Sequence, residues 1–157
     1  MQELQKKAVD LLIESAREVF EMMVGRPLAE GVPVEGDAVR PKANVVGTVS
    51  FAGSESGMVV FYSTTDAAKE IAGSMLGMPA ADVNGEMPDA IGEITNMIAG
   101  ALRTKMTDSG HPWAISIPTV TIGSDFYTKY VSDVKRVLCP FRMGEEEICV
   151  ELIMMKN

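Results

Sequence analysis

The stretch NVVGTVSFAGSESGMVVFYSTTD, residues 44–66, passes from strand to turn to strand to helix start within one short segment. Residues 44–51 are rich in valine, as strands are, and residues 58–62 form the expected return strand. The glycines and serines between these two strands predict a hairpin turn. A phosphate-binding loop is the less favoured alternative, because such a loop normally leads into a helix N-terminus, whereas this segment joins two strands. The side-chain oxygens of residues 63–66 can then cap a helix, which we expect to end at Gly77.

The chain before this stretch predicts one helix and one irregular segment. Apolar residues recur at helical spacing across residues 3–24, and a glycine and a proline end the pattern. Residues 26–41 are rich in proline and glycine, which predicts an extended loop or an edge segment of a sheet. Two consecutive methionines, Met22 and Met23, are expected to pack in the core.

The second half of the chain predicts one long helix and three strands. The helix is expected over residues 89–106, after a loop bounded by prolines. Residues 114–120 alternate with a period of two, and residues 127–140 and 146–155 have the pattern of two further strands. The predicted fold class is therefore α+β, an antiparallel sheet with packed helices, in a single domain that spans residues 1–157.

The predicted helix over residues 89–106 has two unlike faces. One stripe is apolar, as a core-facing helix requires, and it holds Ile91, Ile94, Ile98, Ala101 and Leu102. The opposite stripe is polar, and it holds Asp89, Glu93, Asn96, Gly100, Arg103 and, just past the stretch, Thr107. An acid and an amide one turn apart, followed by a glycine, make a flat surface that can insert into another protein's cleft. From helix chemistry alone, an ordinary solvent-exposed face remains the simpler explanation.

The composition restricts the partners and the compartment. A formal charge of −8 and a pI near 4.7 argue against nucleic acid and anionic membranes, which both favour basic surfaces. The sequence has neither a membrane-spanning run nor the apolar core of a signal peptide, so we expect a cytoplasmic protein without membrane insertion. Cys139 and Cys149 have no metal or disulfide spacing and predict buried free thiols. His111 is expected to serve a turn, and Trp113 the core or an interface.

A short internal echo links the first and third predicted helices. The first carries Asp10-x3-Glu14-x2-Arg17, which repeats the acid spacing of the helix at residues 89–106, where Asn96 holds the third position. Each helix is followed by strands. A match this short can arise by chance; if it reflects a duplication, the fold is a pseudo-repeat in which one copy lacks its amide.

The polar stripe resembles a known signature. Asp89-x3-Glu93-x2-Asn96, with Pro118 after 21 intervening residues, looks like the motif of the CheC/CheX/FliY family of phosphatases that act on phosphorylated CheY. Residues 44–78 are similar to the glycine-punctuated hairpin and following helix of that family, and the resemblance covers nearly the whole chain. CheC and FliY relatives commonly carry two copies of the motif. Because this chain has one, it resembles CheX most closely.

The resemblance implies a role for each residue of the motif. Asn96 would orient the water that attacks an aspartyl phosphate on a CheY-like receiver domain, and Glu93 would pair with a lysine of that receiver. Asp89 would contribute to partner binding, although a plain helix-start role explains it as well. Gly100 would leave the docking surface without a protruding side chain at that position, although helix packing also explains a glycine there.

The resemblance also implies partners and cofactors. The Mg²⁺ that the reaction needs would belong to the receiver, so no metal or other cofactor is expected in this chain. A homodimer formed through an edge strand is expected. Two alternatives stay open: a non-catalytic switch or adaptor module of a chemotaxis or other two-component pathway, and an unrelated α+β domain.

Overall fold

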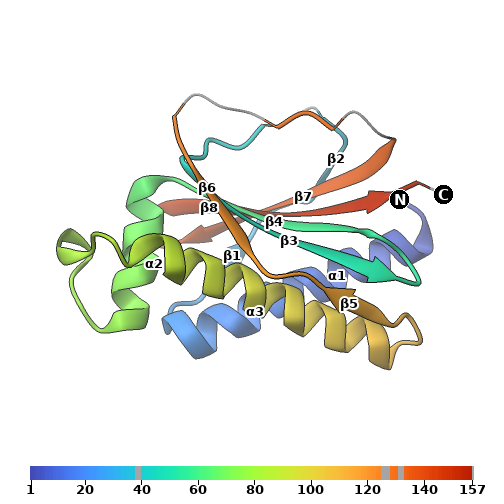
Figure 1. The fold of residues 1–157 in the computed structure, drawn as a ribbon, viewed down its shortest axis with the longest axis horizontal. Helices are drawn as coiled ribbons and strands as arrows, with labels where there is room; N and C mark the ends of the chain where they lie inside the picture. The colour runs from blue at the N-terminus through green and yellow to red at the C-terminus, as the bar shows by residue number, and fades with distance from the viewer. Residues whose placement is uncertain (38–39, 125–127, 131–132, 157) are drawn as a thin grey trace.

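The computed structural model describes residues 1–37, 40–124, 128–130 and 133–156. The helices are α1 (Glu3–Val19), its π-helical continuation η1 (Phe20–Val24), α2 (Thr65–Leu76), the 3-10 turn η2 (Ala80–Asp82) and α3 (Met87–Asp108). The strands are β1 (Ala29–Glu30), β2 (Val34–Glu35), β3 (Val45–Gly53), β4 (Gly57–Ser63), β5 (Trp113–Ile115), β6 (Thr119–Ile122), β7 (Val134–Met143) and β8 (Glu146–Met155). In Figure 1, α1 and α3 lie side by side against one sheet.

The strands form an antiparallel sheet in the order β1-β7-β8-β4-β3-β5. In addition, β2 pairs with β7, and β6 pairs with β3. The long strands β4 and β8 therefore lie in the middle, and the short strands form both edges. This arrangement confirms the predicted α+β class with an antiparallel sheet and packed helices.

The sheet has an internal pseudo-two-fold arrangement, which confirms the predicted pseudo-repeat. Each half contains a helix, an edge strand broken into two pieces, and a hairpin of two long strands: α1, β1/β2, β3 and β4 in the first, and α3, β5/β6, β7 and β8 in the second. The edge pieces of each half pair with a long strand of the other half, β1/β2 with β7 and β5/β6 with β3. α2 connects the two halves.

The main core lies between the helices and the inner face of the sheet. Its fully buried side chains include Leu12 in α1, Phe20 in η1, Phe61 in β4, and Phe141 and Ile148 in the β7–β8 hairpin. The outer face of the sheet carries a second, smaller apolar cluster, formed by Val46, Val60, Tyr62, Leu138 and Ile153. α3 thus packs on one face of the sheet, and the second cluster lies on the other.

The hairpin and helix predicted from residues 44–66 are confirmed. β3 and β4 pair along their length, from Val45 opposite Ser63 to Phe51 opposite Gly57. The Thr64 hydroxyl accepts a hydrogen bond from the Ala67 amide at 3.1 Å, which caps the first turn of α2. Gly77 ends α2 in the left-handed conformation, with φ of 68°, which glycine adopts without a steric penalty.

Two of the predicted strands differ from the structure. The strand expected over residues 114–120 is broken into β5 and β6, because Pro118 lacks an amide hydrogen and the Ser116 hydroxyl, in place of a backbone carbonyl, accepts the hydrogen bond from the Ser50 amide. The strand expected over residues 127–140 begins only at Val134, where pairing with β8 starts. Residues 127 and 131–132 of that prediction lie outside the described residues. The segment expected to be a loop or edge is confirmed as an edge by β1 and β2.

The prediction that Met22 and Met23 pack in the core is wrong. Their exposed fractions are 76% and 37%. The helical turn that holds them is a π-turn, in which Phe20 and Val24 face the core instead. A π-turn has more residues per turn than an α-helix, so a stripe extrapolated at the α-helical period drifts off the buried face. None of the helices in the described part of the chain is long and apolar enough to cross a membrane.

Candidate functional site

The two faces of α3 are those that the sequence predicts. Ile91, Ile94, Ile98 and Leu102 are fully buried against the sheet and α1, whereas Ala101 is only half-buried. The polar stripe on the opposite side of α3 is exposed or half-buried, and Figure 1 shows the helix running along one side of the sheet. The buried stripe therefore fixes the rotation of the helix, and that rotation decides which polar side chains face solvent.

The helix lies unusually close to the sheet at one point. Gly47 of β3 faces Thr95 of α3, and a Cβ atom at Gly47 would overlap the Thr95 hydroxyl and lie 3.0 Å from Thr95 Cβ. Thr95 is itself fully buried, and its hydroxyl donates to the Ile91 carbonyl at 2.7 Å. This contact sets the height of the helix above the sheet one residue before Asn96.

The residues of the predicted motif lie together on the exposed side of α3. Asp89 and Glu93 are exposed, and Asn96 and Gly100 are half-buried. Among the described residues, the side chains of Asp89, Glu93 and Asn96 make no hydrogen bond or ion pair. Their acceptors, and the Asn96 amide donors, are therefore free to bind a partner or an ordered water.

The broken edge strand borders this stripe. A Cβ atom at Gly92 would lie 3.4 Å from Val120 Cγ2 and 3.9 Å from Pro118 Cγ, and one at Gly100 would lie 4.0 Å from Ile115 Cδ1. Gly92 and Gly100 stand one helical turn before and after Asn96, so the Asn96 side chain emerges beside the break between β5 and β6. The structure thus brings Pro118, the last residue of the motif, next to the helix that carries the others.

The equivalent surface of α1 is occupied by an internal ion pair. Asp10, Glu14 and Arg17 are all exposed, as their counterparts on α3 largely are. However, Arg17 Nη1 lies 3.3 Å from Glu30 Oε1 of the edge strand β1. The first half of the fold therefore presents a paired cation where the second half presents a free carboxamide.

His111 and Trp113 serve the structure at the end of α3. Both side chains contact Glu55 in the β3–β4 turn: Trp113 Nε1 donates at 2.9 Å, and His111 Nδ1 lies 3.2 Å from the other carboxylate oxygen. The Trp113 ring also stacks on Phe51, with ring centroids 3.9 Å apart. These contacts fasten the hairpin turn to the chain after α3, whereas Asn96 lies in the middle of that helix.

A buried polar cluster on the outer face of the sheet was not predicted from the sequence. Glu151 is only 2% exposed, and it accepts hydrogen bonds from Tyr62 Oη at 2.6 Å and from Arg136 Nε at 2.9 Å. Arg136 also donates to Asp37 and lies under the Tyr130 ring. Burial, reinforced by the Glu151 charge, raises the pKa of the Tyr62 hydroxyl well above its usual range. The only sequence signal was an acidic residue within an apolar strand.

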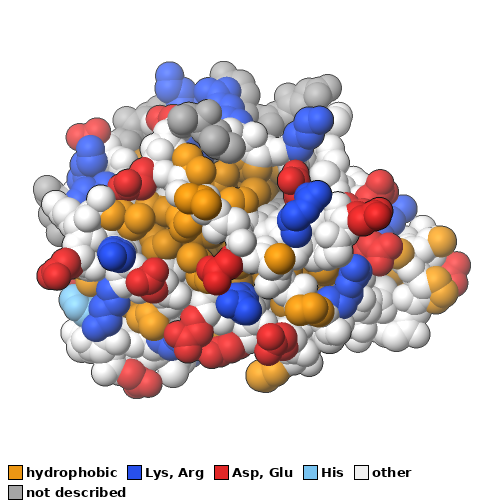
Figure 2. Space-filling model, turned by 180° about the vertical axis from the view of Figure 1, so that it is seen from behind, with side chains coloured by type: hydrophobic (Ala, Val, Ile, Leu, Met, Phe, Trp, Pro, Cys, Tyr) orange, Lys and Arg blue, Asp and Glu red, His pale blue; other side chains and the backbone are white. Residues whose placement is uncertain are grey.

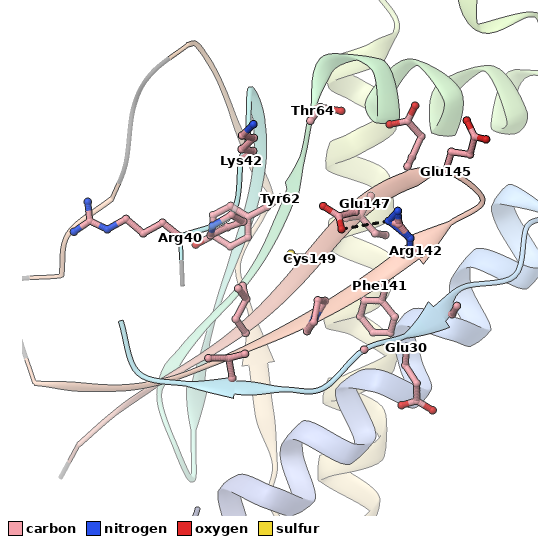
Figure 3. A pocket seen from close by; sticks show the side chains of 18 residues that line it. Glu30, Arg40, Lys42, Tyr62, Thr64, Phe141, Arg142, Glu145, Glu147 and Cys149 are labelled. Atoms are coloured by element: carbon pink, nitrogen blue, oxygen red, sulfur yellow. Dashed lines mark hydrogen bonds and ion pairs between the residues drawn. The ribbon is translucent and has the colours of Figure 1, made fainter. Parts of the chain in front are cut away.

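A large cavity in the described part of the structure lies away from the motif. It has a volume of about 870 Å³ and lies at the β1–β7–β8 end of the sheet, against outward-facing side chains such as Tyr62, Leu138 and Cys149 (Figure 3). Arg40 and Lys42 stand on one side of it, and no residue of α3 lines it. Apolar side chains also gather at the centre of the face turned away from the viewer of Figure 1 (Figure 2). Neither cavity size nor exposed apolar surface alone therefore identifies the site.

Among the described residues, neither the cysteines nor the metal-ligand side chains form a further reactive centre. Burial raises the pKa of Cys139 to about 12 and that of Cys149 to about 11, so both remain protonated thiols at neutral pH. Both cysteines are free, as the sequence predicts, although only Cys139 is fully buried. Across the described ranges of the chain, no group of three or more His, Cys, Asp or Glu side chains could hold a metal ion.

The described structure is an α+β domain with an exposed acid–amide stripe on one helix, and comparison with known proteins assigns the family. The family model described as chemotaxis phosphatase CheX matches residues 45–142. The chain belongs to the CheX family. This confirms the resemblance drawn from the motif and the glycine pattern.

Individual relatives agree with the family assignment. The protein named CheY-P phosphatase CheX from Thermotoga maritima is 28% identical over 127 residues, which cover 80% of this chain and 82% of that protein. Among solved structures, a CheC-like superfamily protein from Shewanella sp. PV-4 has a TM-score of 0.88 at 22% identity, covering 99% of this chain and 100% of that chain. The CheX–CheY–BeF3–Mg²⁺ complex from Borrelia burgdorferi has a TM-score of 0.74 at 20% identity, covering 94% and 97%. These structures show that the fold is shared.

Proposed function

We propose that this protein hydrolyses the aspartyl phosphate of a phosphorylated CheY-like receiver domain. Membership of the chemotaxis phosphatase family supports the proposal, as do the relative named CheY-P phosphatase CheX and the solved complex of a CheX with CheY. The observation that carries it is the pair of unpartnered side chains on the exposed side of α3, the Glu93 carboxylate and the Asn96 carboxamide, one turn apart.

In this proposal, Asn96 positions the attacking water. Its carboxamide oxygen accepts a hydrogen bond from the water, and its amide group can donate to a phosphoryl oxygen. The water oxygen bonds to phosphorus while the bond from phosphorus to the aspartyl oxygen breaks, which releases inorganic phosphate and regenerates the receiver carboxylate. An acyl phosphate is already activated, so placement of one water supplies most of what the reaction needs.

Glu93 orients the partner rather than the water. Its carboxylate stands three residues before Asn96 on the same helical face, so a lysine of the receiver that pairs with it is held close to the amide. The Mg²⁺ would be held by the receiver, with no ligand from this chain. Asp89 and Gly100 extend the same surface, Asp89 as a second acidic contact and Gly100 as a position without a side chain. A cytoplasmic homodimer joined through one of the edge strands belongs to the same proposal.

The experiment that tests this role is phosphate release from phosphorylated receivers. Asn96→Ala should lower the turnover of the phosphatase by about 100-fold or more, because one well-placed hydrogen-bonding group contributes a few kcal/mol to the transition state. Binding of the receiver should persist, and the circular dichroism spectrum and melting temperature should stay unchanged. Turnover by the variant equal to that of the wild type would refute the role of Asn96, and binding without turnover by the wild type would support the adaptor alternative.

A matched pair of charge reversals tests Glu93. Glu93→Lys should weaken receiver binding through like-charge repulsion, whereas Glu14→Lys, at the equivalent exposed position of α1, should not. Equal affinities of the two variants in a titration would count against the pairing of Glu93 with the receiver.

A further inference from the structure

A groove runs beside the acid–amide stripe, between the last turn of α2 and the first turns of α3. Its volume is about 700 Å³. Met75 and Leu76 of α2 form one wall, and Asp89, Ala90 and Glu93 of α3 form the other. Figure 1 shows this junction at the end of the molecule where α2 meets the start of α3. Glu93 therefore belongs both to the polar stripe and to the groove.

The groove combines an apolar wall with an acidic one. Leu76 is 51% exposed, and the half-buried Met75 continues this apolar wall toward the core. Glu86, Asp89 and Glu93 place three carboxylates along roughly 10 Å of α3. Among the described lining residues there is no lysine, arginine or histidine. A hydrogen bond from the Asn84 backbone amide lowers the pKa of the Glu86 carboxyl.

The charge along α3 is asymmetric. The charged side chains of α3 before Asn96 are Asp89 and Glu93, whereas the half after it carries Arg103 and Lys105, with Asp108 as the last residue of the helix. An interface of ordinary size covers about 800 Å² of each partner's surface. A patch of that area centred on Glu93 and Asn96 has a radius of roughly 16 Å, so the partner extends beyond these two residues along α3. A partner with a cation at Glu93 is attracted toward the acidic half and repelled by the basic half. The groove lies in the acidic half.

We propose that this groove is a specificity subsite for the receiver, and that it takes a segment carrying one apolar and one basic side chain. The inference rests on the proposed function, since it assumes that the receiver docks on Glu93 and Asn96. The apolar side chain of the receiver packs on Leu76 and Met75, and the basic side chain lies among Glu86, Asp89 and Glu93. The reaction at Asn96 is the same for every acyl phosphate and does not distinguish one receiver from another. In this proposal, the subsite makes that distinction.

The first test replaces the apolar wall and leaves the stripe intact. Leu76→Asp should raise the KM for the phosphorylated receiver by about tenfold or more while kcat stays within about twofold, because binding to the subsite is uniform in the ground and transition states. Met22→Asp is the matched control, since Met22 is also an exposed apolar side chain but lies at the end of α1, in η1. An unchanged KM for Leu76→Asp, or an equal rise for Met22→Asp, would overturn the inference.

The second test removes charge from the acidic wall. Glu86→Gln combined with Asp89→Asn should weaken binding of the receiver at low salt and flatten the dependence of affinity on salt. Glu3→Gln combined with Asp10→Asn removes two exposed carboxylates from α1 and should change neither. An unchanged salt dependence in the first pair would overturn the charged half of the inference.

The two proposals fail in distinguishable ways. If the wild-type protein dephosphorylates a receiver and the groove variants match it, the subsite is wrong and the proposed function stands. If the wild type binds an acyl-phosphate mimic of the receiver without turning over the phosphorylated form, the groove variants still report on docking through the dissociation constant. If no receiver binds or is dephosphorylated, both proposals are refuted.

Discussion

The close approach of α3 to β3 makes Gly47 the position where one methyl group should have the clearest effect. In a strand interior, glycine costs roughly 0.5–1 kcal/mol relative to alanine, so Gly47→Ala would stabilise the protein if space allowed. The structure leaves no space, because the new Cβ atom would overlap the hydroxyl of the fully buried Thr95. The sign of the change in stability therefore tests the packing directly.

Overpacking a well-filled core costs about 1–3 kcal/mol. After the gain in strand propensity is subtracted, we expect Gly47→Ala to lower the free energy of unfolding by about 1–2 kcal/mol, which corresponds to a fall in melting temperature of roughly 2–8 °C for a domain of this size. Urea and thermal unfolding, followed by circular dichroism, measure this change. Because Thr95 precedes Asn96, a helix lifted by the methyl group should also lose phosphatase activity in excess of its loss of stability.

Two comparisons decide whether the cost arises at Thr95. Gly85→Ala introduces the same methyl group where no atom lies within 4 Å, so its effect should be near zero. Thr95→Ala removes the overlapping hydroxyl, and the double variant with Gly47→Ala should be about 1 kcal/mol more stable than the sum of the single changes predicts. If Gly47→Ala is as benign as Gly85→Ala, or if the double variant shows no coupling, then the explanation by close packing is wrong.

Two further predictions concern the sheet. Burial raises the pKa of Cys139 to about 12 and that of Cys149 to about 11, so both thiols should react with a disulfide reagent at pH 8 far more slowly in the native protein than after denaturation. The stability that these raised pKa values give the folded state is lost as the pH rises from about 9 toward 12, so the urea midpoint should fall across that range. A midpoint that rises there would contradict the pKa shifts. Glu151→Ala should cost about 3 kcal/mol, because it leaves the Arg136 guanidinium without its main partner. The combined replacement Glu151→Leu and Arg136→Met should recover most of that loss in urea unfolding, and a double variant no more stable than Glu151→Ala would rule out the unpaired charge as its origin.

The elements that the sequence predicts well are those with local causes. The hairpin at residues 44–66 follows from strand propensity and turn glycines, and α2 follows from its Thr64 cap and the glycine at its end. The proline and glycine content of residues 26–41 indicated a loop or an edge, but β1 and β2 have two residues each and pair with β7, more than 100 residues later, so their exact positions could not be predicted locally. The error at Met22 has a similar origin, because the π-turn is a local departure from the period that the prediction assumed.

The candidate site also has features that could be predicted from local sequence and features that could not. The solvent exposure of Glu93 and Asn96 could be predicted, because the period of α3 alone decides which side chains face away from the core. The groove could not, since it depends on where the last turn of α2 meets the first turn of α3. The contact of Gly47 with Thr95 and the proximity of Pro118 to Gly92 likewise join residues that are distant in the sequence.

The pseudo-two-fold arrangement separates what the fold provides from what the residues decide. α1 and α3 hold equivalent places, each beside a broken edge strand that pairs with a long strand of the other half. The architecture thus offers two similar helical surfaces, and both carry two acids at the same spacing. They differ at the third position, where Arg17 is paired with Glu30 and Asn96 is free. A paired guanidinium has no acceptor for a water, whereas a carboxamide has both donor and acceptor groups. If Asn96 acts as proposed, the number of active sites in this chain is therefore set by one side chain in each half.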